Sequence, residues 1–497
     1  MPESESPVSE DLASAIRGLA GEALRVADGS DLEREADLVV RRYNEPLRVA
    51  IAGRTKAGKS TLLNALVGER LAATDASECT RIVTWYHHAL GYAVSAQLRP
   101  SGVRELPFRR KGGELEIDLG ELEVDAIERI EVGWPSQKLV DITLIDTPGL
   151  GSTDQRSSER TTDALLDGGT EGPGEADAVI YLMRHLHRSD TQFLEAFTDR
   201  SIAYASPINA IVVLSRADEI GAARLDALDS AHSVAARYAG DRRVRELASG
   251  VVPVAGLIAE TAATLREQEY GWLRDIAALD EDRREALLHS VDRFRDPDMH
   301  PHGSDIREEL LRRFGLFGLR KAIGFIVDGS TQTATELSGA LLALSGIRDL
   351  QRLLVERYTT RAQALKARTA LAGLRSIADK LERRGVPGAS VLVAEIERVE
   401  ASSQEIAQLR LLHLVLTGLI EVTDAERAEI DRLSGSGPLG PRAGLPPEAP
   451  PDQIRIAALG GVEKWRARMG DPLADRRTIE AAEIISRAYE EIYSLAG

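Results

Sequence analysis

The 497-residue chain is poor in cysteine, in long apolar runs and in positive charge, and each shortage excludes a class of protein. Its single cysteine, Cys79, rules out a disulfide within the chain, and the acidic start MPESESPVSE has no apolar signal-peptide core. The longest apolar candidate, Leu409–Leu419, is interrupted by Arg410 and His413 and is far shorter than the ~20 residues that span a bilayer. These absences predict a cytoplasmic protein whose contact with a membrane is peripheral, at the inner face of the plasma membrane.

Acidic residues outnumber basic ones by 79 to 62, which leaves a formal net charge of -17. A chain of this charge repels a polyanion at long range, so nucleic acid is not expected as a partner. The hydrophobic content of 43% is enough for a large core, and a chain of this length is expected to form two or three domains.

Short β-branched runs, separated by helical or polar stretches, begin at Leu47 and end at Ala255. This alternation is typical of a mainly parallel sheet with helices on both faces, and several runs are apolar throughout, as doubly buried strands should be. We therefore expect an α/β nucleotide-binding domain over residues 47–329. The runs are LRVAIAG, RIVTWYHH, YAVSAQL, VDITLID, AVIYLM, INAIVVL and VVPVA.

The rest of the chain is expected to be helical apart from a disordered stretch at residues 1–10. Helices over 11–46 should pack with an elongated, all-α stalk at 330–497. Between Gly329 and Arg384 there is no proline and apolar residues keep a helical spacing, which predicts one helix roughly 80 Å long. A hairpin turn at 385–390 leads into a second long helix, a Pro- and Gly-rich loop at 434–452 follows, and a last helix completes a four-helix bundle.

The strongest motif is GRTKAGKS, which follows the first strand and precedes a helical run. Its glycines let backbone N–H groups wrap a phosphate chain, Lys59 neutralises the β- and γ-phosphates, and the Ser60 hydroxyl can bind Mg²⁺. This pattern predicts a P-loop. Nucleotide contacts are expected from Gly53, Arg54, Lys56, Ala57, Gly58, Lys59, Ser60 and Thr61.

A second motif, DTPG, ends another buried strand. Its Asp146 carboxylate can hold Mg²⁺, and Gly149 can offer its N–H to the γ-phosphate. Between the two motifs Thr80 can close the Mg²⁺ shell and orient the attacking water, whereas its competitors are Thr74 and Thr84, and Thr84 falls inside a strand. The expected metal ligands are Ser60, Thr80 and Asp146.

The base is expected to meet the sequence Ser-Arg-Ala-Asp that follows the strand ending at Leu214. Asp218 can accept hydrogen bonds from the N1–H and the exocyclic amine of guanine, which adenine cannot supply, and Arg216 can lay its guanidinium on the ring. The alternative is that Asp218 caps a helix and Arg216 is solvated. After the next strand, the backbone N–H of Ala255 is expected near the guanine carbonyl oxygen.

The order of these motifs, with a long helical region after them, resembles the dynamin superfamily, above all its bacterial members. The runs GRTKAGKSTLLNALVG and ATDASECTRIVTWY are closer still to the isoniazid-inducible dynamin-like proteins of mycobacteria. The likeness is specific over about residues 47–220 and architectural beyond them. It implies GTP and Mg²⁺ as cofactors, self-association through G domains or with a related dynamin-like protein, and a stalk that acts on lipid bilayers.

The chain departs from the dynamin pattern in its P-loop and in its base motif. Dynamins place Gln-Ser where this chain has Thr55-Lys56, so we hypothesise that the Lys56 ammonium stands where the family holds a monovalent cation. The base motif has Ser-Arg in place of Thr or Asn followed by Lys. The residues expected to take part in catalysis are Thr55, Lys56, Lys59, Thr80 and Gly149.

Eight basic residues and only two acidic ones lie between Arg357 and Arg384. Such a surface can touch anionic membrane lipids, but it can equally be solvated or pair with Glu395, Glu397 and Glu400. The leading expectation is a GTPase that binds bilayers and remodels, fuses or maintains membrane. The alternatives are a soluble regulatory GTPase that serves as a scaffold, and a nucleotide switch with negligible turnover.

Overall fold

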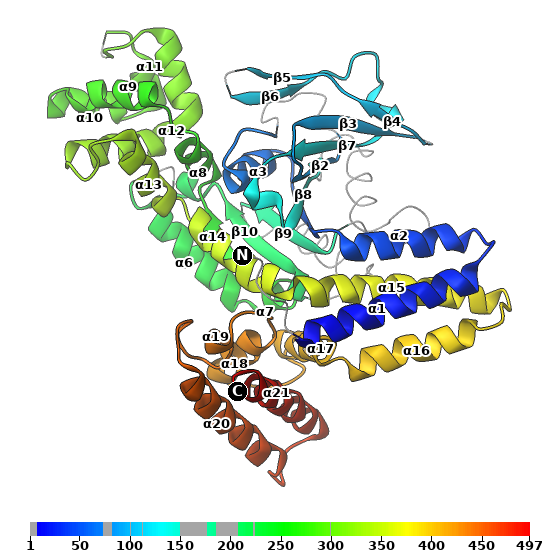
Figure 1. The fold of residues 1–497 in the computed structure, drawn as a ribbon. Helices are drawn as coiled ribbons and strands as arrows, with labels where there is room; N and C mark the ends of the chain where they lie inside the picture. Colours follow the sequence, from blue (N-terminus) through cyan, green and yellow to red (C-terminus); the bar gives the residue numbers. More distant parts are fainter. Residues whose placement is uncertain are drawn as a thin grey trace.

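The structure is a computed structural model that describes residues 7–72, 82–99, 101–111, 113–149, 176–184, 207–221, 224–298 and 300–497. Its centre is a nine-stranded sheet with the order β11-β10-β9-β1-β8-β2-β7-β3-β4 (Figure 1). Beside it, β5 (Phe108–Lys111) and β6 (Glu114–Ile117) form an antiparallel pair. The strands of the large sheet are β1 (Leu47–Gly53), β2 (Thr84–His88), β3 (Ala93–Leu98), β4 (Val103–Glu105), β7 (Ile127–Trp134), β8 (Ile142–Asp146), β9 (Ala178–Met183), β10 (Ala210–Ser215) and β11 (Val251–Val254).

Most pairings in this sheet are parallel, as predicted. β1 runs parallel to β8 and β9, and β10 runs parallel to β9 and β11, whereas β2–β8, β3–β7 and β3–β4 are antiparallel. Helices α3 (Lys59–Val67) and α14 (Ile347–Arg357) share a core with one face of β1. The other face packs on the chain around α6 (Ala227–Gly240) and α7 (Arg242–Arg245). The α/β fold class is therefore confirmed.

The prediction from sequence missed β7, which pairs with β2 and β3 inside the sheet. Its sequence IERIEVGW alternates apolar and charged residues over its first half, where Ile127 and Ile130 are buried and Glu128 is exposed. A half-buried strand of this kind has no continuous apolar run. It therefore lacks the pattern from which doubly buried strands are predicted.

A helical lobe follows β11 and lies at the upper left of Figure 1. Phe314, Phe317 and Leu273 are buried in its core. Gly315 has a φ of 61°, and the long helix α12 is kinked there. The lobe consists of α8 (Gly256–Ala263), α9 (Glu267–Ala277), α10 (Glu281–Leu288), α11 (Val291–Arg295), α12 (Ser304–Val327) and α13 (Ala334–Leu344).

A four-helix bundle extends to the right in Figure 1 and contains α1 (Pro7–Ala27), α2 (Leu32–Asn44), α15 (Ala362–Arg383) and α16 (Ala389–Ser402). The chain turns between α15 and α16 at Gly385 and Gly388, which have φ values of 70° and 93°. Because α1 begins at Pro7, the expectation of disorder over residues 1–10 is wrong for residues 7–10, and residues 1–6 lie outside the described part.

The single helix predicted from Gly329 to Arg384 is wrong. The chain forms α13, α14, a 3₁₀ turn η6 (Thr359–Arg361) and α15 instead. At the first break Gly346 has a φ of 77°, and a Cβ there would collide with the carbonyl oxygen of Pro253 at the end of β11. The helix breaks because this stretch docks on the edge of the sheet before it enters the bundle.

The C-terminal helices form a separate group below the sheet in Figure 1, so their predicted place in the stalk bundle is also wrong. Trp465 and Tyr489 lie in their core and donate hydrogen bonds to Glu429 at 2.9 and 2.7 Å. A short helix, α19, interrupts the loop expected at 434–452. The group comprises α17 (Gln404–Leu416), α18 (Asp424–Leu433), α19 (Leu439–Arg442), α20 (Pro451–Met469) and α21 (Arg476–Leu495).

The basic stretch at 357–384 does not form a free cationic surface, because most of its charges pair within the fold. The alternative, pairing with acidic neighbours, is confirmed for Arg375, which lies 3.6 Å from Glu397 and 3.0 Å from Glu400. The other ion pairs are Arg357–Asp431, Arg361–Asp431, Lys380–Glu35 and Arg384–Asp31. Within the described residues, no helix has both the length and the apolar character that crossing a membrane requires.

Candidate nucleotide-binding site

The P-loop connects the end of β1 to the start of α3, and two glycines give it its shape. Gly53 has a φ of 149°, and a Cβ there would come 2.5 Å from the carbonyl oxygen of Leu182. Gly58 caps the N-terminus of α3 with a φ of 94°. Lys56 also adopts a left-handed φ, 63°, which non-glycine residues rarely do. The loop thus turns sharply enough to point backbone N–H groups toward a phosphate.

Three polar side chains meet where β1 and β8 end side by side. Lys59 is only 9% exposed, and its ammonium donates to the carbonyl oxygen of Gly53 at 3.4 Å. The Ser60 hydroxyl donates to Asp146 Oδ2 at 2.7 Å. Burial lowers the pKa of Lys59 and raises the pKa of Asp146, and the opposite charge of each partner counters both shifts. A bound anion would therefore stabilise the Lys59 ammonium, and a bound cation would stabilise the Asp146 carboxylate.

The donor set at this point fits Mg²⁺. Asp146 Oδ1 is buried and has no hydrogen-bond partner among the described residues, and the Ser60 hydroxyl lies against the other oxygen of the same carboxylate. Hard cations such as Mg²⁺ prefer carboxylate and hydroxyl oxygens. Thr80, the third predicted ligand, and its competitor Thr74 lie outside the described residues. Thr84 lies in β2, as expected from its sequence.

The DTPG segment lies directly against the P-loop. A Cβ on Gly149 would come 2.5 Å from Thr55 Oγ1 and 2.8 Å from the Thr55 backbone nitrogen, so only glycine fits here. Thr147 holds the segment to β1 by donating to the carbonyl oxygen of Ile51 at 2.9 Å. The residues that the sequence separates by about 90 positions therefore meet at one phosphate-sized location.

A cavity of about 150 Å³ lies on the other side of the P-loop. Asp218 is 8% exposed at its wall, and burial raises the pKa of this carboxylate. Asp218 belongs to the 3₁₀ turn η5 (Ala217–Glu219), whose N-cap is Arg216, so the helix-cap alternative for Asp218 is wrong. The lining residues are Ala57, Gly58, Thr61, Leu62, Leu182, Val213, Ser215, Arg216, Asp218, Glu219, Val254, Gly256 and Leu257.

Arg216 ties this cavity to the phosphate end of the site. Its guanidinium donates to the carbonyl oxygen of Lys56 at 3.0 Å and to Glu219 at 2.8 Å, while Glu219 also pairs with Arg184 at 2.8 Å. Arg216 has a φ of 53°, so its backbone shares the left-handed conformation of Lys56. Glu219 was not among the predicted residues, although its position directly after Asp218 indicates that it lies at the same site.

The prediction for Ala255 is wrong. Its backbone N–H donates to the carbonyl oxygen of Ser345 at 2.9 Å, and the residue is fully buried. Gly256, the first residue of α8, lines the cavity in its place. Nothing in the local sequence indicates that Ser345, far along the chain, accepts from this N–H.

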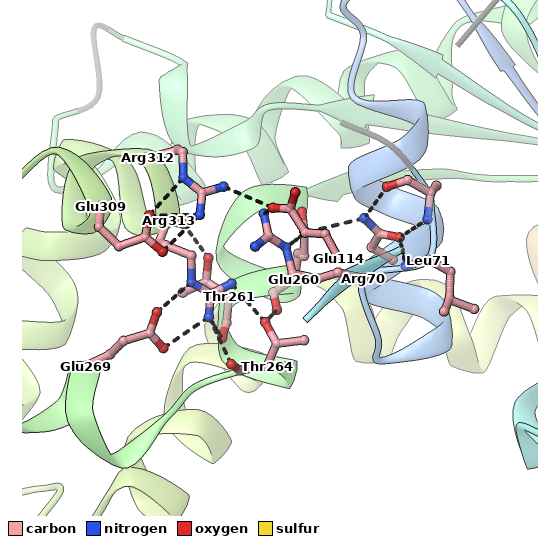
Figure 2. A network of polar contacts seen from close by, with 12 residues as sticks. Arg70, Leu71, Glu114, Glu260, Thr261, Thr264, Glu269, Glu309, Arg312 and Arg313 are labelled. Atoms are coloured by element: carbon pink, nitrogen blue, oxygen red, sulfur yellow. Dashed lines mark hydrogen bonds and ion pairs between the residues drawn. The ribbon is translucent and has the colours of Figure 1, made fainter. Parts of the chain in front are cut away.

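A buried polar network joins the P-loop helix to the helical lobe (Figure 2). The Asn64 amide of α3 accepts from the backbone N–H groups of Leu71 and Ala72 at 2.9 and 2.7 Å. Arg70, in the same segment, pairs with Glu260 of α8 at 2.9 Å. This network anchors the chain just before residue 73, where the described residues stop on the way to Thr80.

The fold and the site together define a P-loop GTPase. Residues 48–214 match the family described as 50S ribosome-binding GTPase. Isoniazid-induced protein IniC of Mycobacterium tuberculosis is 38% identical over 464 residues, which cover 93% of this chain and 92% of that protein. The chain belongs to the IniC family of dynamin-like proteins.

Two further likenesses are weaker. Isoniazid-induced protein IniA of Mycobacterium tuberculosis is 27% identical over 264 residues, which cover 48% of this chain and 36% of that protein. A chain from a solved structure of an oligomerised bacterial dynamin pair is 13% identical, covers 97% of this chain and 90% of its own, and superposes with a TM-score of 0.34. That score is too low to carry an argument about the arrangement of the helices.

Proposed function

We propose that this protein binds GTP with Mg²⁺, hydrolyses it to GDP and phosphate, and acts at the cytoplasmic face of the membrane in remodelling, fusion or maintenance. The observation that carries the proposal is that one site has groups suited to phosphates and a metal ion at one end and a group suited to a base at the other. Lys59, Ser60 and Asp146 meet at one end, and the buried carboxylate of Asp218 lies at the other. This arrangement suits a triphosphate joined to a guanine base.

The roles of the residues follow from their chemistry. The Lys59 ammonium neutralises phosphate oxygens, and the P-loop N–H groups hold them in place. Asp218 accepts from the two guanine donors, and the guanidinium of Arg216 braces the loop between base and phosphates. Ser60, Asp146 and the predicted Thr80 would hold Mg²⁺, which would neutralise charge on the β- and γ-phosphates. Thr55 and Gly149 fill the position beside the γ-phosphate, where the attacking water must be oriented.

Lys56 is proposed to replace the monovalent cation that related GTPases hold. Its side chain is exposed, and its carbonyl is anchored by Arg216 at 3.0 Å, so the ammonium can reach over the phosphates while the backbone stays in place. We expect wild-type turnover to be the same in K⁺, Na⁺ and choline buffers. Lys56→Ala should lower turnover and make it dependent on K⁺. A wild-type rate that rises steeply with K⁺ would exclude this role.

Membrane contact is proposed at the tip of the hairpin formed by α20 and α21. Leu473, in the turn, is 93% exposed, and Leu419 of the neighbouring loop is 51% exposed. The two loops adjoin, because Arg477 donates to the carbonyl oxygen of Leu419 at 3.3 Å. Inserting a leucine contributes about 1.5–3 kcal/mol, so one tip binds weakly and several tips in an assembly bind well.

The competing function is a soluble regulatory GTPase that serves as a scaffold for a protein partner. One observation favours it: the basic stretch at 357–384 is largely paired within the fold and offers little charge to a lipid surface. In this case the exposed hairpin tip would contact a protein. GTP hydrolysis is common to both functions, so only lipid binding separates them.

The test measures GTP turnover and liposome co-sedimentation with the wild type, Leu473→Asp and a matched control, Leu90→Asp. Leu90 is 99% exposed in the loop between β2 and β3, far from the hairpin tip. We expect liposome binding to be lost in Leu473→Asp alone, with basal turnover unchanged, and turnover to vanish in Lys59→Ala. Turnover without liposome binding in the wild type would favour the scaffold. Absence of turnover would favour a nucleotide switch.

A further inference from the structure

A second polar cavity, of about 40 Å³, lies where the sheet-bound part of the chain meets the C-terminal helices. It is walled by η6 and the start of α15 on one side, and by α17, α21 and the segment after α18 on the other. Arg361, Arg442 and Gln408 line it, and these side chains belong to residues that are 3%, 6% and 6% exposed. The cavity is separate from the nucleotide site and shares no residue with it.

Four nitrogen donors of these side chains are buried and have no hydrogen-bond partner among the described residues. They are Nε and Nη1 of Arg361, Nε of Arg442 and Nε2 of Gln408. Buried polar groups without a partner are rare in folded proteins, and several at one cavity call for an explanation. Because all four are donors, the missing partner must be rich in acceptor oxygens.

The carboxylates around the cavity engage only some of the N–H groups of its arginines. Arg361 Nη2 donates to the side chain and the carbonyl oxygen of Asp431, both at 2.7 Å, and Arg357 pairs with the same carboxylate. Burial, followed by the nearby charge of Arg357, lowers the pKa of Arg361 to about 9. Arg442 donates to Glu491 at 3.2 Å. Arg357 and Arg361 thus share one carboxylate, and the remaining N–H groups of Arg361 and Arg442 stay available for acceptor oxygens in the cavity.

A carboxylate in the wall also constrains the ligand. Glu405 lines the cavity, and its Oε2 accepts from the Ser403 hydroxyl at 2.9 Å. A fully deprotonated anion would be repelled by Glu405, whereas an anion that keeps one proton at neutral pH can donate to it. Phosphate groups have a second pKa of about 6, so beside a carboxylate they can keep this proton, whereas sulfate is fully deprotonated near neutral pH.

We propose that this cavity binds a phosphate group, either as inorganic phosphate or as the headgroup of a phosphate monoester. Its oxygens accept from Arg361, Arg442 and Gln408, and its proton faces Glu405. A space of about 40 Å³ holds about three water molecules at 10–15 Å³ each, which is the room that a single tetrahedral oxyanion needs. The bound phosphate joins η6 to the C-terminal helices and strengthens their docking.

The test uses the full chain carrying Lys59→Ala, so that the P-loop cannot account for phosphate binding. Thermal unfolding and calorimetric titration are measured with inorganic phosphate and with sulfate at equal ionic strength. Phosphate is expected to raise the unfolding temperature in a saturable way, and sulfate is expected not to. Absence of a phosphate effect, or an equal effect of sulfate, would overturn the proposal, because the cavity would then hold water or bind anions without selection.

A second variant, Gln408→Leu in the same background, tests the site itself. It removes a buried donor without changing the volume much, so the unfolding temperature without phosphate should stay the same or rise, while phosphate should bind about tenfold more weakly. Gln351→Leu on α14, outside the cavity, is the matched control and should bind phosphate like the parent. Equal phosphate binding in Gln408→Leu and the parent would contradict the assignment.

A final arm separates the two sources of the phosphate group. Glycerol 3-phosphate carries the headgroup chemistry of a simple lipid on a small soluble molecule. Tighter binding of glycerol 3-phosphate than of inorganic phosphate would identify a headgroup site that opens at the protein surface. Weaker binding would identify a closed site for free phosphate, and both results require the same donors.

Discussion

At the scale of single residues, Asp218 is the group on which the choice of base depends. Replacing Asp218 by Asn turns one acceptor into a donor, so the N1–H and exocyclic amine of guanine lose their common partner. We expect Asp218→Asn to weaken GTP binding by roughly tenfold to a hundredfold and to improve binding of xanthosine triphosphate, whose 2-carbonyl accepts from the new amide. Fluorescence titration with both nucleotides measures this.

The control for this prediction is Asp226→Asn, a nearby acidic residue whose side chain is 58% exposed and which does not line the cavity. It should leave both affinities unchanged. If Asp218→Asn bound GTP as tightly as the wild type, the 150 Å³ cavity would not be the guanine pocket.

A second residue-scale prediction concerns His300, which lies between α11 and α12. Its ring meets Phe294 edge-on with a centroid distance of 4.7 Å, and its Nδ1 accepts from the backbone N–H of His302 at 3.0 Å. Burial, then the charges of His302 and Arg307, lower its pKa from 6.5 to about 4. The unfolded chain therefore takes up a proton at higher pH than the folded one. The part of the stability that depends on neutral His300 should be fully present above pH 6.5 and should decrease as the pH falls toward 4.

Urea unfolding at a series of pH values measures this loss. His300→Asn keeps an acceptor for the His302 N–H and removes the titrating group, so it should flatten the decrease between pH 6.5 and 4. His289→Asn, at an exposed position in the same lobe, should leave the decrease unchanged. A slope that survives in His300→Asn would assign the acid sensitivity to other groups.

At the scale of elements, the break between α13 and α14 is a feature that can be tested by substitution. Gly346 combines a φ of 77° with close contact to the end of β11, so Gly346→Ala should destabilise the protein by at least about 1–3 kcal/mol. Gly339 is a helical glycine of α13 with open space around it, and Gly339→Ala should stabilise by about 0.5–1 kcal/mol. Chemical denaturation of both variants compares them directly.

The opposite signs expected for these two changes come from backbone conformation and space, because the residue types are the same. If both glycines tolerated alanine equally, α13 and α14 would be continuous, as the apolar spacing suggests, and the docking on β11 would be incorrect. The same argument explains why Gly385 and Gly388 allow α15 and α16 to fold back on each other.

At the scale of the whole molecule, Asp177 joins the four-helix bundle to the sheet. Its side chain is 2% exposed, pairs with Arg42 of α2 at 3.0 Å and accepts from the backbone N–H of Arg48 at 3.0 Å. A second link runs from Lys366 of α15 to the carbonyl oxygen of Glu45 at 3.0 Å. The bundle is therefore attached through α2, which precedes the sheet in the chain, and through α15, which follows it.

Asp177→Ala removes the buried carboxylate that pairs with Arg42 and accepts from the Arg48 backbone N–H, so we expect a loss of about 3–5 kcal/mol. Asp37→Ala, which removes a partly exposed ion pair to Arg41 on the same helix, should cost less than about 1 kcal/mol. Calorimetry should also resolve separate transitions for the bundle and the G domain in Asp177→Ala. An unchanged single transition would mean that other contacts hold the two parts together.

The sequence by itself determined the features that depend on neighbours in the chain. The P-loop and DTPG were predictable because a few contiguous residues must supply glycine flexibility, a cation and a metal ligand at the end of a buried strand. The place of Asp218, just after β10 and in the wall of the cavity, follows in the same way, and its role toward the base stays a prediction. The parallel sheet followed from apolar runs such as β9 and β10, which are buried at every position.

Only the tertiary structure decided the features that depend on distant partners. Apolar spacing is the same in one long helix and in three short ones. It could not show that the helix breaks at Gly346, where the backbone packs against Pro253 of β11. The N–H of Ala255 donates to Ser345, and Arg375 and Lys380 of α15 pair with carboxylates from other helices. A side chain's partner is chosen by the fold, because hydrogen bonds and ion pairs act over a few ångströms in space and not along the sequence.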